Sequence, residues 1–336
     1  MSSTETDLSG AELNILYLVN RKYYIKKMAR ERFLSMEAIS KTYPVARVEF
    51  WGVGWSGYDN NLSVSKNLEY LNCWNNGIMD ENIEFDIVIA YKPLEMKEFK
   101  NIPYPKCLRY NEMWDTRWTL REIGESGCEL VICHHLNDYR RYTAMKINEV
   151  KFVYVGHCVD PTIFRSYGGE KKYDIMLGGH VSARHYPLRA RLRNIISGMS
   201  SKYRVYIHPH PGYDLEKAHT NKYLIEFAQR ISESRIAVTC ASKYGYRLGK
   251  YVEIPACQTV IAADLPNDDA DDYSYIIQLN NSMSDAEIRN KLIMYLENED
   301  KYEEKLFLGE QFARNYTWDK YAKRVISEIN IFLNDR

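Results

Sequence analysis

The sequence has no long hydrophobic run and no excess of charge of either sign. Its longest apolar stretches, such as FDIVIA and TVIAAD, have the length of a strand, which excludes a transmembrane helix. The N-terminal segment MSSTETDLSG is polar and lacks the apolar core of a signal peptide, so we expect a cytoplasmic protein without a membrane span. The 45 basic and 45 acidic residues balance, which argues against a chain coated with positive charge for nucleic acid, although a local basic patch could still bind it.

Cysteine and glycine patterns exclude further classes of protein. The seven cysteines are odd in number and scattered, and no two form a Cys-x-x-Cys pair, so neither a disulfide framework nor a zinc knuckle is expected. Such cysteines are typical of free thiols in a reducing compartment. The chain also lacks the G-x-G-x-x-G and Walker patterns, which argues against nicotinamide-dependent enzymes and P-loop ATPases.

What the sequence does contain is an alternation of strand-like and helix-like segments. A chain of 336 residues, 45% of them hydrophobic, can fill two cores of about 150 residues each. Strands separated by helical segments predict parallel βαβ units, and therefore open sheets covered by helices. The predicted strands are 13–19, 46–51, 85–90, 108–110, 130–133, 152–155, 173–177, 204–207, 236–239 and 259–263, and the predicted helices are 24–41, 117–125, 137–147, 223–232, 249–257, 285–298, 301–316 and 317–333, with another beginning near 187.

We therefore expect an α/β protein with two Rossmann-like, doubly wound domains that face a cleft. The polar stretch RSYGGEKK at 165–172 predicts a linker between a domain at 1–164 and a domain at 173–316, with a terminal helix at 317–336. Ligands of such sheets bind at the carboxyl ends of the strands. All eight histidines lie between 134 and 219, and several directly follow a predicted strand. Any one of them could be a loop histidine that binds nothing, and no Cys/His spacing supports a zinc site, but their repeated placement favours a role in the cleft.

Two segments of the second half predict an anion site. Gly178-Gly179 ends a predicted strand, with Arg184 and a helix start at Pro187 following. Glycines let backbone amides approach an anion, and a helix start adds the positive end of its dipole, although a bare glycine pair is also common in ordinary turns. In the segment 243–268, Lys250 and Glu253 lie three residues apart and share a helix face. A surface ion pair is the simplest interpretation, but the apolar neighbours in KYVEIPAC argue against it.

Three motifs in order resemble a known family. KYVEIPAC resembles the KYxEIPAxG signature of group 1 glycosyltransferases of the CgeB-like type, VGHCVDPTIF (155–164) resembles their GVDxxxF segment, and YDIMLGGH followed by YPLRARL resembles the opening of their C-terminal domain. The likeness covers about 150–268. It implies the GT-B fold, a nucleotide-diphosphate-sugar donor held mainly by the C-terminal domain, and a glycan or glycoconjugate acceptor held mainly by the N-terminal domain. It further implies no cofactor or essential metal, a leaning towards retention, and a terminal helix that crosses back onto the first domain.

The resemblance and the strand ends together suggest a set of site residues. Preorganised positive charge from Arg184, Arg247 and Lys250 would stabilise the departing diphosphate. The first domain offers Glu112, Asp115 and His134 as acceptor-binding residues, from which an inverting enzyme would draw its base. The expected donor-binding residues are Gly178, Gly179, His180, His208, His210, Tyr246 and Glu253.

The sequence also departs from the family pattern. Many group 1 enzymes carry Glu-x7-Glu, whose second glutamate matches Glu253, but here the first position is Gly245, and Gln258 replaces a usual glycine. Two alternatives therefore stay open: a phage- or virus-type enzyme that glycosylates DNA bases, and a non-catalytic sugar-binding protein on the same fold. The basic segment RKYYIKKMARER (21–32), with Lys26, Lys27 and Arg30, is either a solvated helix face or a site for an anionic acceptor or nucleic acid.

An acidic loop could imitate a metal site. Asp264, Asp268, Asp269, Asp271 and Asp272 resemble the manganese motif of single-domain GT-A transferases. That motif ends an early strand, however, and this loop comes late in the chain, behind KYVEIPAC. We therefore interpret it as a solvated acidic loop and expect no metal ligands.

Overall fold

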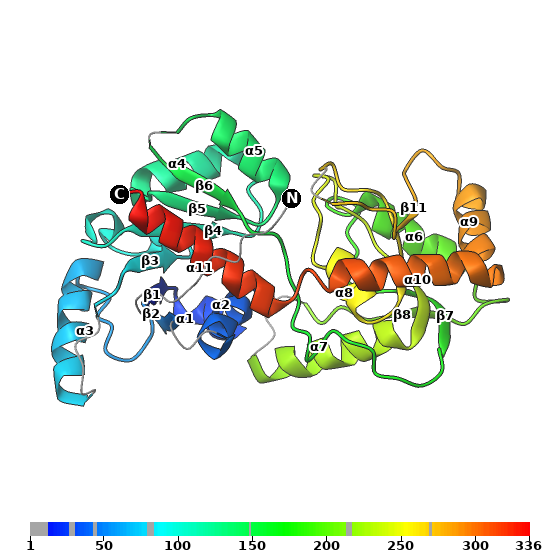
Figure 1. Cartoon of the computed structure of the whole chain (residues 1–336), viewed down its shortest axis with the longest axis horizontal. Coiled ribbons are helices and arrows are strands. Elements are labelled where there is room, and N and C mark those ends of the chain that lie inside the picture. The colour runs from blue at the N-terminus through cyan, green and yellow to red at the C-terminus, as the bar shows by residue number, and fades with distance from the viewer. Residues whose placement is uncertain are drawn as a thin grey trace.

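The computed structural model describes residues 13–26, 31–42, 46–78, 84–147, 149–212, 217–268 and 271–336. They form two α/β lobes placed side by side (Figure 1). The lobe with the N-terminal half of the chain is called the first domain below, and the other the second domain. Lys27 and Arg30 of the basic segment lie outside the described residues, as does the side chain of Lys26.

The first domain is built on a six-stranded, fully parallel sheet in the order β2-β1-β3-β4-β5-β6. The strands 87–90 (IVIA) and 130–133 (LVIC) within it are continuous apolar runs, because helices cover both faces of the sheet. Helices α2 and α11 pack against one face, and α3, α4 and α5 against the other. The strands are β1 (Leu13–Leu18), β2 (Ala46–Trp51), β3 (Ile87–Ala90), β4 (Lys106–Tyr110), β5 (Leu130–Cys133) and β6 (Lys151–Tyr154); the helices are α1 (Arg21–Lys26), α2 (Glu31–Thr42), α3 (Val64–Ile78), α4 (Thr116–Ser126) and α5 (Leu136–Ala144), with short 3₁₀ turns at Pro93–Glu95 and Phe99–Asn101.

The second domain repeats this plan on a five-stranded parallel sheet in the order β11-β10-β9-β7-β8. Helices α7 and α8 pack on one face and α6 and α9 on the other. The strands are β7 (Tyr173–Leu177), β8 (Val205–Ile207), β9 (Ser234–Val238), β10 (Val260–Ala263) and β11 (Ile277–Gln278); the helices are α6 (Pro187–Ser197), α7 (Lys217–Ser232), α8 (Lys250–Ala256), α9 (Asp285–Glu297) and α10 (Glu299–Ala313).

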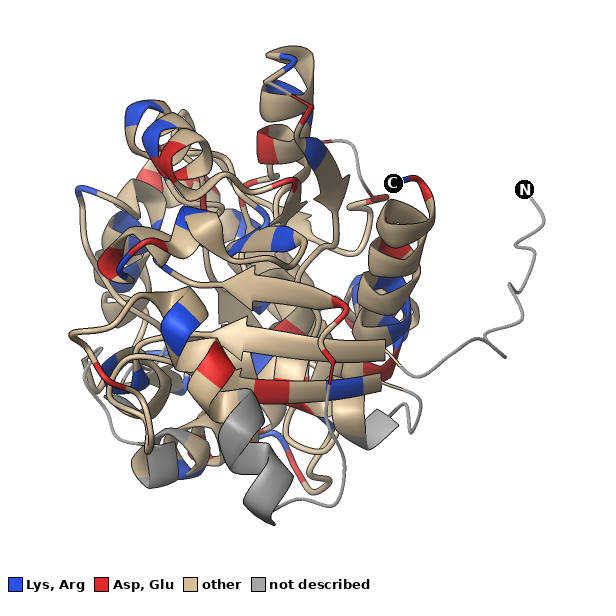
Figure 2. Ribbon diagram, turned by 90° about the vertical axis from the view of Figure 1, so that its left-hand side faces the viewer, with Lys and Arg blue, Asp and Glu red and all other residues tan. Residues whose placement is uncertain are grey.

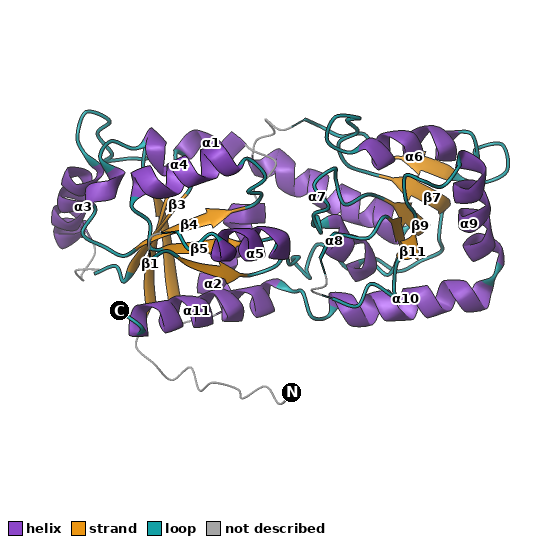
Figure 3. Ribbon diagram, turned by 90° about the horizontal axis from the view of Figure 1, so that it is seen from above, coloured by secondary structure: helices purple, strands orange, loops and turns teal. Residues whose placement is uncertain are grey.

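Two chain segments connect the domains and pair with each other. The amide of Val159 donates to the carbonyl of Tyr316 over 2.9 Å, and the amide of Trp318 donates to the carbonyl of Val159 over 3.0 Å. Beyond this bridge, α11 (Trp318–Asn334) returns to the first domain and buries an apolar stripe against its sheet. Figure 3 shows α10 and α11 following one another along one side of both domains. The expected pair of Rossmann-like domains and the terminal helix that crosses back are thus confirmed.

A few elements differ from the sequence predictions. Helix α3 was not expected, and the helix predicted over 24–41 corresponds to α1 and α2, between which 27–30 are not described. Helix α7 begins earlier than predicted, at Lys217, and β11 is an additional edge strand of two residues. Pro255 lies one residue before the end of α8, and it is buried against Gly309 of α10, which explains a proline in this helix.

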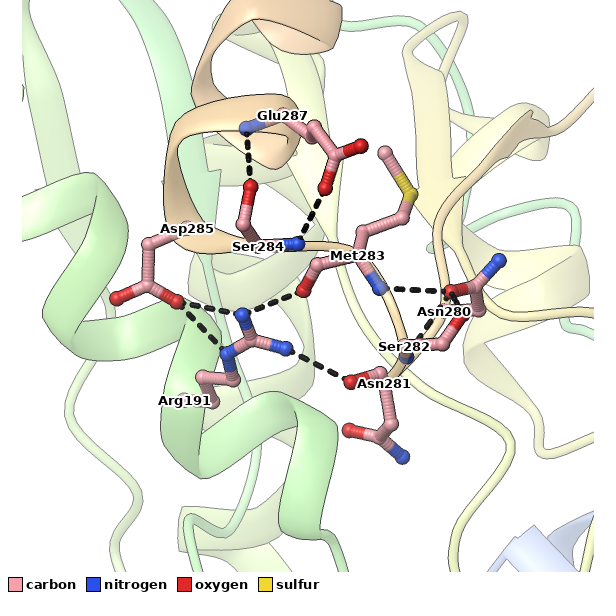
Figure 4. Close-up of polar contacts among 8 residues, drawn as sticks. All are labelled: Arg191, Asn280, Asn281, Ser282, Met283, Ser284, Asp285 and Glu287. Atoms are coloured by element: carbon pink, nitrogen blue, oxygen red, sulfur yellow. Dashed lines mark hydrogen bonds and ion pairs between the residues drawn. The ribbon is translucent and has the colours of Figure 1, made fainter.

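Polar contacts fix α6 to the opposite edge of the second domain. Arg191, from the motif YPLRARL, donates to the carbonyls of Asn281 and Met283 and pairs with Asp285 at 2.7 Å (Figure 4). Ser284 and Glu287 form a capping box at the start of α9, which satisfies the free amides there. Arg191 is therefore a structural residue that ties α6 to the loop after β11 and to the start of α9.

Two further expectations concern the whole chain. Within the described ranges, no helix has both the length and the apolar character needed to cross a bilayer. The six cysteines whose side chains are described are all free thiols, five of them buried.

Candidate functional site

The strand order of each sheet places a crevice at a defined point. In the first sheet the chain runs from β1 outward to β2 and then returns to β3 on the other side of β1, and in the second sheet β7 lies likewise between β8 and β9. Where the strand order reverses, the loops leaving the two central strands separate, and ligands of doubly wound sheets bind there, at the carboxyl ends. The loops after β1 and β3, and those after β7 and β9, are therefore the two places to examine.

In the second domain, a glycine pair and a lysine meet at this point. Gly179, directly after β7, has φ +94°, a conformation that residues with a Cβ rarely adopt. A Cβ on Gly179 would lie 2.6 Å from Cε of Lys250, because the lysine side chain passes over the glycine turn. A Cβ on Gly178 would collide with the ring of Phe227. Both glycines are thus required sterically, and they bring the ammonium group of Lys250 to the backbone that follows β7.

Lys250 and Glu253 lie on the first turn of α8 and form an ion pair with an Nζ–Oε2 distance of 3.6 Å. The two side chains are only 20% and 6% exposed, so the interpretation as a surface ion pair is wrong. Oε2 of Glu253 is buried and has no hydrogen-bond donor among the described residues. A buried carboxylate oxygen without a donor is costly, so this position favours a ligand that carries hydroxyl or amide hydrogens.

Three predicted histidines line the same sheet edge. The rings of His180 and His210 are 5.3 Å apart, and His208 packs against Tyr223 and Phe227. Burial, reinforced by neighbouring cations, lowers the pKa of His208, and lowers the pKa of His210 to about 4. Both imidazoles are therefore neutral near pH 7 and can accept or donate hydrogen bonds without adding charge.

Arg189 is the residue that sequence reasoning missed here. It is buried, it donates to the carbonyl of His180 over 3.0 Å and to Oγ1 of Thr239 over 3.0 Å, and it would lie 3.3 Å from a Cβ on Gly179. Arg184, which we expected to supply this charge, is exposed in the loop before α6. In the sequence, Pro187 indicates the first turn of α6, which makes Arg189 the third residue of that helix.

Tyr246 lies between the domains. Its hydroxyl donates to Oδ1 of Asp138 over 2.8 Å, and its ring stacks on His135 with the centroids 4.0 Å apart. Asp138 and His135 both belong to the first domain, and Asp138 also accepts from the amide of Met113. The described contacts of Tyr246 therefore hold the two domains together, and its donor-binding role stays a prediction.

Arg247 is also buried at this interface. Its Nη1 lies 3.2 Å from Asp271, and its guanidinium carbon lies 4.2 Å from the ring centroid of Tyr316. Gly156, from the motif VGHCVDPTIF, gives it room, since a Cβ there would collide with the guanidinium group. These contacts explain the residue structurally, and its catalytic role stays a prediction.

His134 is enclosed in the first domain beside the segment that follows β6. It is 3% exposed, its Nδ1 lies 2.9 Å from the carbonyl of Val155, and its ring stacks on His157 at 4.8 Å. Burial, with Arg109 nearby, lowers its pKa well below the usual range. Its acceptor-binding role stays a prediction.

The acidic loop after β10 is only partly solvated. Asp272 is exposed, as expected, whereas Asp264, Asp268 and Asp271 are half-buried, which corrects the sequence interpretation for these three. Asp264 accepts from the amide of Ala241 and the hydroxyl of Tyr251, and Asp268 and Asp271 accept from tyrosine hydroxyls. These acids are hydrogen-bonded parts of the domain. Among the described residues, no group of three or more histidines, cysteines or acids could hold a metal ion.

The first domain carries a pocket of about 620 Å³ at its own switch point. It is lined by the loops after β3 and β4, by one face of α4, and by Tyr23, which follows β1. Tyr186 of the second domain completes its wall. Glu112 and Asp115, two predicted acceptor-binding residues, line this pocket, and Asp115 also caps α4 by accepting from the amide of Trp118 over 3.0 Å.

Comparison with known proteins identifies the architecture. Neither a family model nor a curated protein sequence matches the chain. Solved structures do match: Anabaena Alr3699/HepE in complex with UDP has a TM-score of 0.63 at 10% identity, with 95% of this chain and 100% of that chain covered. The fold is GT-B. Sucrose-phosphate synthase from Thermosynechococcus elongatus gives a TM-score of 0.61 at 8% identity over 96% of this chain and 100% of that one, and S. aureus MnaA with UDP gives 0.53 at 11% identity over 96% and 97%.

Charge on the GT-B first domain is mixed. In Figure 2, which looks onto this domain, basic and acidic segments alternate over the elements in view. Within the described part of the basic segment, Lys22 lies 3.6 Å from Glu95, so part of its charge is already paired. The side chains of 26–32 lie outside the described residues, so both interpretations of the segment 21–32 stay predictions.

Proposed function

We propose that the protein is a glycosyltransferase that moves a sugar from a nucleotide-diphosphate-sugar donor to an acceptor hydroxyl. One observation carries the proposal: Lys250 passes over Gly179 at the switch point of the second sheet, and Arg189 lies beside the same glycine. Two cations beside a glycine turn suit a diphosphate, because its charge is met by fixed donors in a partly buried place. The GT-B neighbours support the proposal, since several were solved with UDP.

In this proposal some residues of the site stabilise charge on the leaving group and others recognise the donor. Lys250 and Arg189 stabilise the negative charge that builds up on the departing diphosphate, and removal of such a donor costs about 100- to 1,000-fold in rate. Glu253 accepts hydrogen bonds from hydroxyls of the donor, which would fill the position at its buried Oε2. His208 and His210 add neutral hydrogen-bonding groups around the nucleotide, and His180 lies next to His210.

The acceptor would enter from the first domain, where Glu112 and Asp115 line the pocket. We propose retention as the stereochemical course, in which the leaving phosphate assists the acceptor and the protein need not supply a base. The assignment to the group 1, CgeB-like type rests on the three motifs. Residues of these motifs make close contacts: a Cβ on Gly156 would collide with Arg247, a Cβ on Gly179 would lie against Lys250, and Lys250 pairs with Glu253.

Calorimetric titration of UDP, ADP, GDP and their glucose conjugates tests the proposal. We expect one nucleotide to bind, and Lys250→Met to weaken it by about ten- to a hundredfold, because hydrogen bonds to charged groups contribute about 1.5–3 kcal/mol. Lys222→Met is the matched control, since Lys222 pairs with Glu226 at 3.9 Å on the exposed face of α7. If no nucleotide binds, or if both variants bind like the wild type, the proposal is wrong.

The two alternatives predict other results. A non-catalytic sugar-binding protein would bind a nucleotide sugar or a glycan but release no nucleotide with any acceptor. A DNA-base glycosyltransferase would bind duplex DNA with an affinity that falls steeply as salt rises. A gel-shift series in increasing salt, with nucleotide present, separates it from the main proposal.

A further inference from the structure

One face of α4 forms a wall of the first-domain pocket. Asp115 at its start and Trp118, Thr119 and Glu122 within it all line the pocket, and residues three, four and seven apart project from the same side of a helix. Trp118 and Glu122 belong to none of the motifs in the sequence. Their chemistry indicates what the pocket holds.

Glu122 is a buried carboxyl group on this wall. It is 3% exposed, and its Oε2 accepts a hydrogen bond from the hydroxyl of Tyr110. Its other oxygen, Oε1, is buried and has no hydrogen-bond partner among the described residues. Burial raises the pKa of this carboxyl group, so it holds a proton more readily than an exposed glutamate does. An unfilled acceptor on the wall of a pocket is accounted for if the ligand supplies the donor.

Aromatic surface is exposed next to this carboxyl group. The side chain of Trp118 is 48% exposed although it lines a pocket. A large aromatic ring left exposed beside hydrogen-bonding groups is suited to the apolar face of a sugar ring. Trp114 is less available, because its ring already stacks on Tyr244 of the second domain, 5.1 Å away and 11° from parallel.

The cations around the pocket are already engaged. Lys92 donates to the hydroxyl of Tyr23 and pairs with Glu95 at 3.1 Å. The guanidinium group of Arg109 donates to the hydroxyl of Tyr321 over 2.6 Å and to Ser35 over 2.8 Å, on the side of α11. The acidic side chains of Glu112, Asp115 and Glu122 line the same pocket. Because Lys92 and Arg109 are bound to other protein groups, the pocket offers little positive charge to a phosphate or carboxylate ligand.

The pocket also reaches the proposed donor site. Tyr186 is its one lining residue from the second domain, and the guanidinium carbon of Arg189 lies 4.4 Å from the ring centroid of Tyr186. Arg189 in turn contacts the loop that carries Gly179 and His180. Tyr186 therefore contacts both the pocket and Arg189 of the proposed donor site.

We propose that this pocket binds an uncharged saccharide as the acceptor, with a sugar ring on Trp118 and a sugar hydroxyl that donates to Oε1 of Glu122. The inference rests on the proposed glycosyltransferase function and gives the class of its acceptor. If the acceptor is uncharged, the anionic acceptor considered for the basic segment 21–32 does not bind in this pocket. Glu122 and Trp118 act here as binding residues that orient the acceptor.

Quenching of tryptophan fluorescence tests the inference, because Trp118 is exposed in the pocket. The probes are methyl glucoside, methyl galactoside, methyl N-acetylglucosaminide and maltose, compared with glucuronic acid and glucose 6-phosphate, with the nucleotide that binds best present throughout. We expect a neutral saccharide to bind more tightly than the acidic sugars. Glu122→Gln and Trp118→Ala should each weaken it about tenfold or more, which corresponds to about 1.4 kcal/mol. For Trp118→Ala, calorimetry replaces fluorescence.

Glu69→Gln is the matched control, because Glu69 lies in the same domain on α3, is exposed and pairs with Lys66 at 2.7 Å. Calorimetry with the nucleotide alone separates the two proposals: nucleotide binding that is unchanged in all variants shows that the donor site is intact. With that result, tighter binding of the acidic sugars, no neutral saccharide binding, or equal behaviour of the Glu122 and Glu69 variants overturns the inference and leaves the transferase proposal standing. If the nucleotide does not bind to the wild type, both proposals fail.

Discussion

A methyl group at Gly179 should separate the stability of the second domain from its affinity for a donor. In Gly179→Ala the new Cβ would lie 2.6 Å from Cε of Lys250, short of the 3.4 Å at which ordinary contact begins. The lysine must therefore move by about 1 Å, a displacement that can cost about 100-fold at a site where geometry matters. The φ of +94° adds backbone strain of about 1–3 kcal/mol. We expect a lower melting temperature and a nucleotide affinity reduced by about ten- to a hundredfold.

Gly57→Ala isolates the effect of backbone strain from the displacement of Lys250. Gly57 has φ +76° in an exposed turn of the first domain, and no heavy atom lies within 4 Å of the Cβ that alanine would add. It should lose comparable stability through the same backbone strain and keep full nucleotide affinity. Differential scanning calorimetry measures the stability, and isothermal titration calorimetry measures the nucleotide affinity. Equal nucleotide affinities in Gly179→Ala and Gly57→Ala would refute the placement of Lys250 over the phosphate-binding backbone.

Three further predictions follow from the interface and the site. Tyr246→Phe removes the hydrogen bond to buried Asp138 and should lower the free energy of unfolding by about 1–3 kcal/mol in urea titrations; an unchanged value would show that this contact does not hold the domains. His134 and His135 have pKa values lowered by burial, so below about pH 6.5 the unfolded chain takes up protons that the folded chain does not, and stability should fall by about 1.4 kcal/mol per pH unit for each histidine. His135→Phe should make this slope shallower, and an equal slope would contradict the assignment. Sugar transfer should persist in EDTA, whereas loss of activity that Mn²⁺ restores would reveal a metal site.

The sequence predicts the central strands well because each is a continuous apolar run between polar loops, as β3 and β10 show. Helix α3 could not be found in this way. Its sequence VSKNLEYLNCWNNGI contains asparagines and a glycine that are typical of loops. Among its described side chains, Val64 and Leu68 are buried in the core and Leu71 packs against it. The strand β11 is too short to leave a pattern.

The residues of the candidate site also differ in whether the sequence alone could locate them. The positions of Gly178, Gly179, Lys250 and Glu253 at the end of β7 and the start of α8 could be predicted, because each lies in a short motif, while their roles stay predictions. Arg189 could not be told from Arg184 by sequence, because only the course of the loop shows which one returns to the sheet edge. The partners of Arg247 come from a loop and a helix end that are distant in sequence, so its burial against Asp271 and Tyr316 was not visible.

Glu122 shows a further limit. Its position in the middle of α4 is unremarkable in the sequence, where an exposed helix face is the simplest expectation for a glutamate. Only the fold places this carboxyl group on the wall of a pocket, next to Tyr110 from the end of β4.

Turnover tests the central claim most directly. Release of nucleoside diphosphate from each nucleotide sugar is followed with the neutral saccharides as acceptors, and the glycosylated product is identified by mass spectrometry. The account predicts one donor that yields equal amounts of nucleotide and product, with kcat/KM about 100- to 1,000-fold lower in Lys250→Met and unchanged in Lys222→Met. A Lys250→Met enzyme as fast as the wild type, or a wild type that binds the nucleotide sugar and transfers nothing, would contradict it.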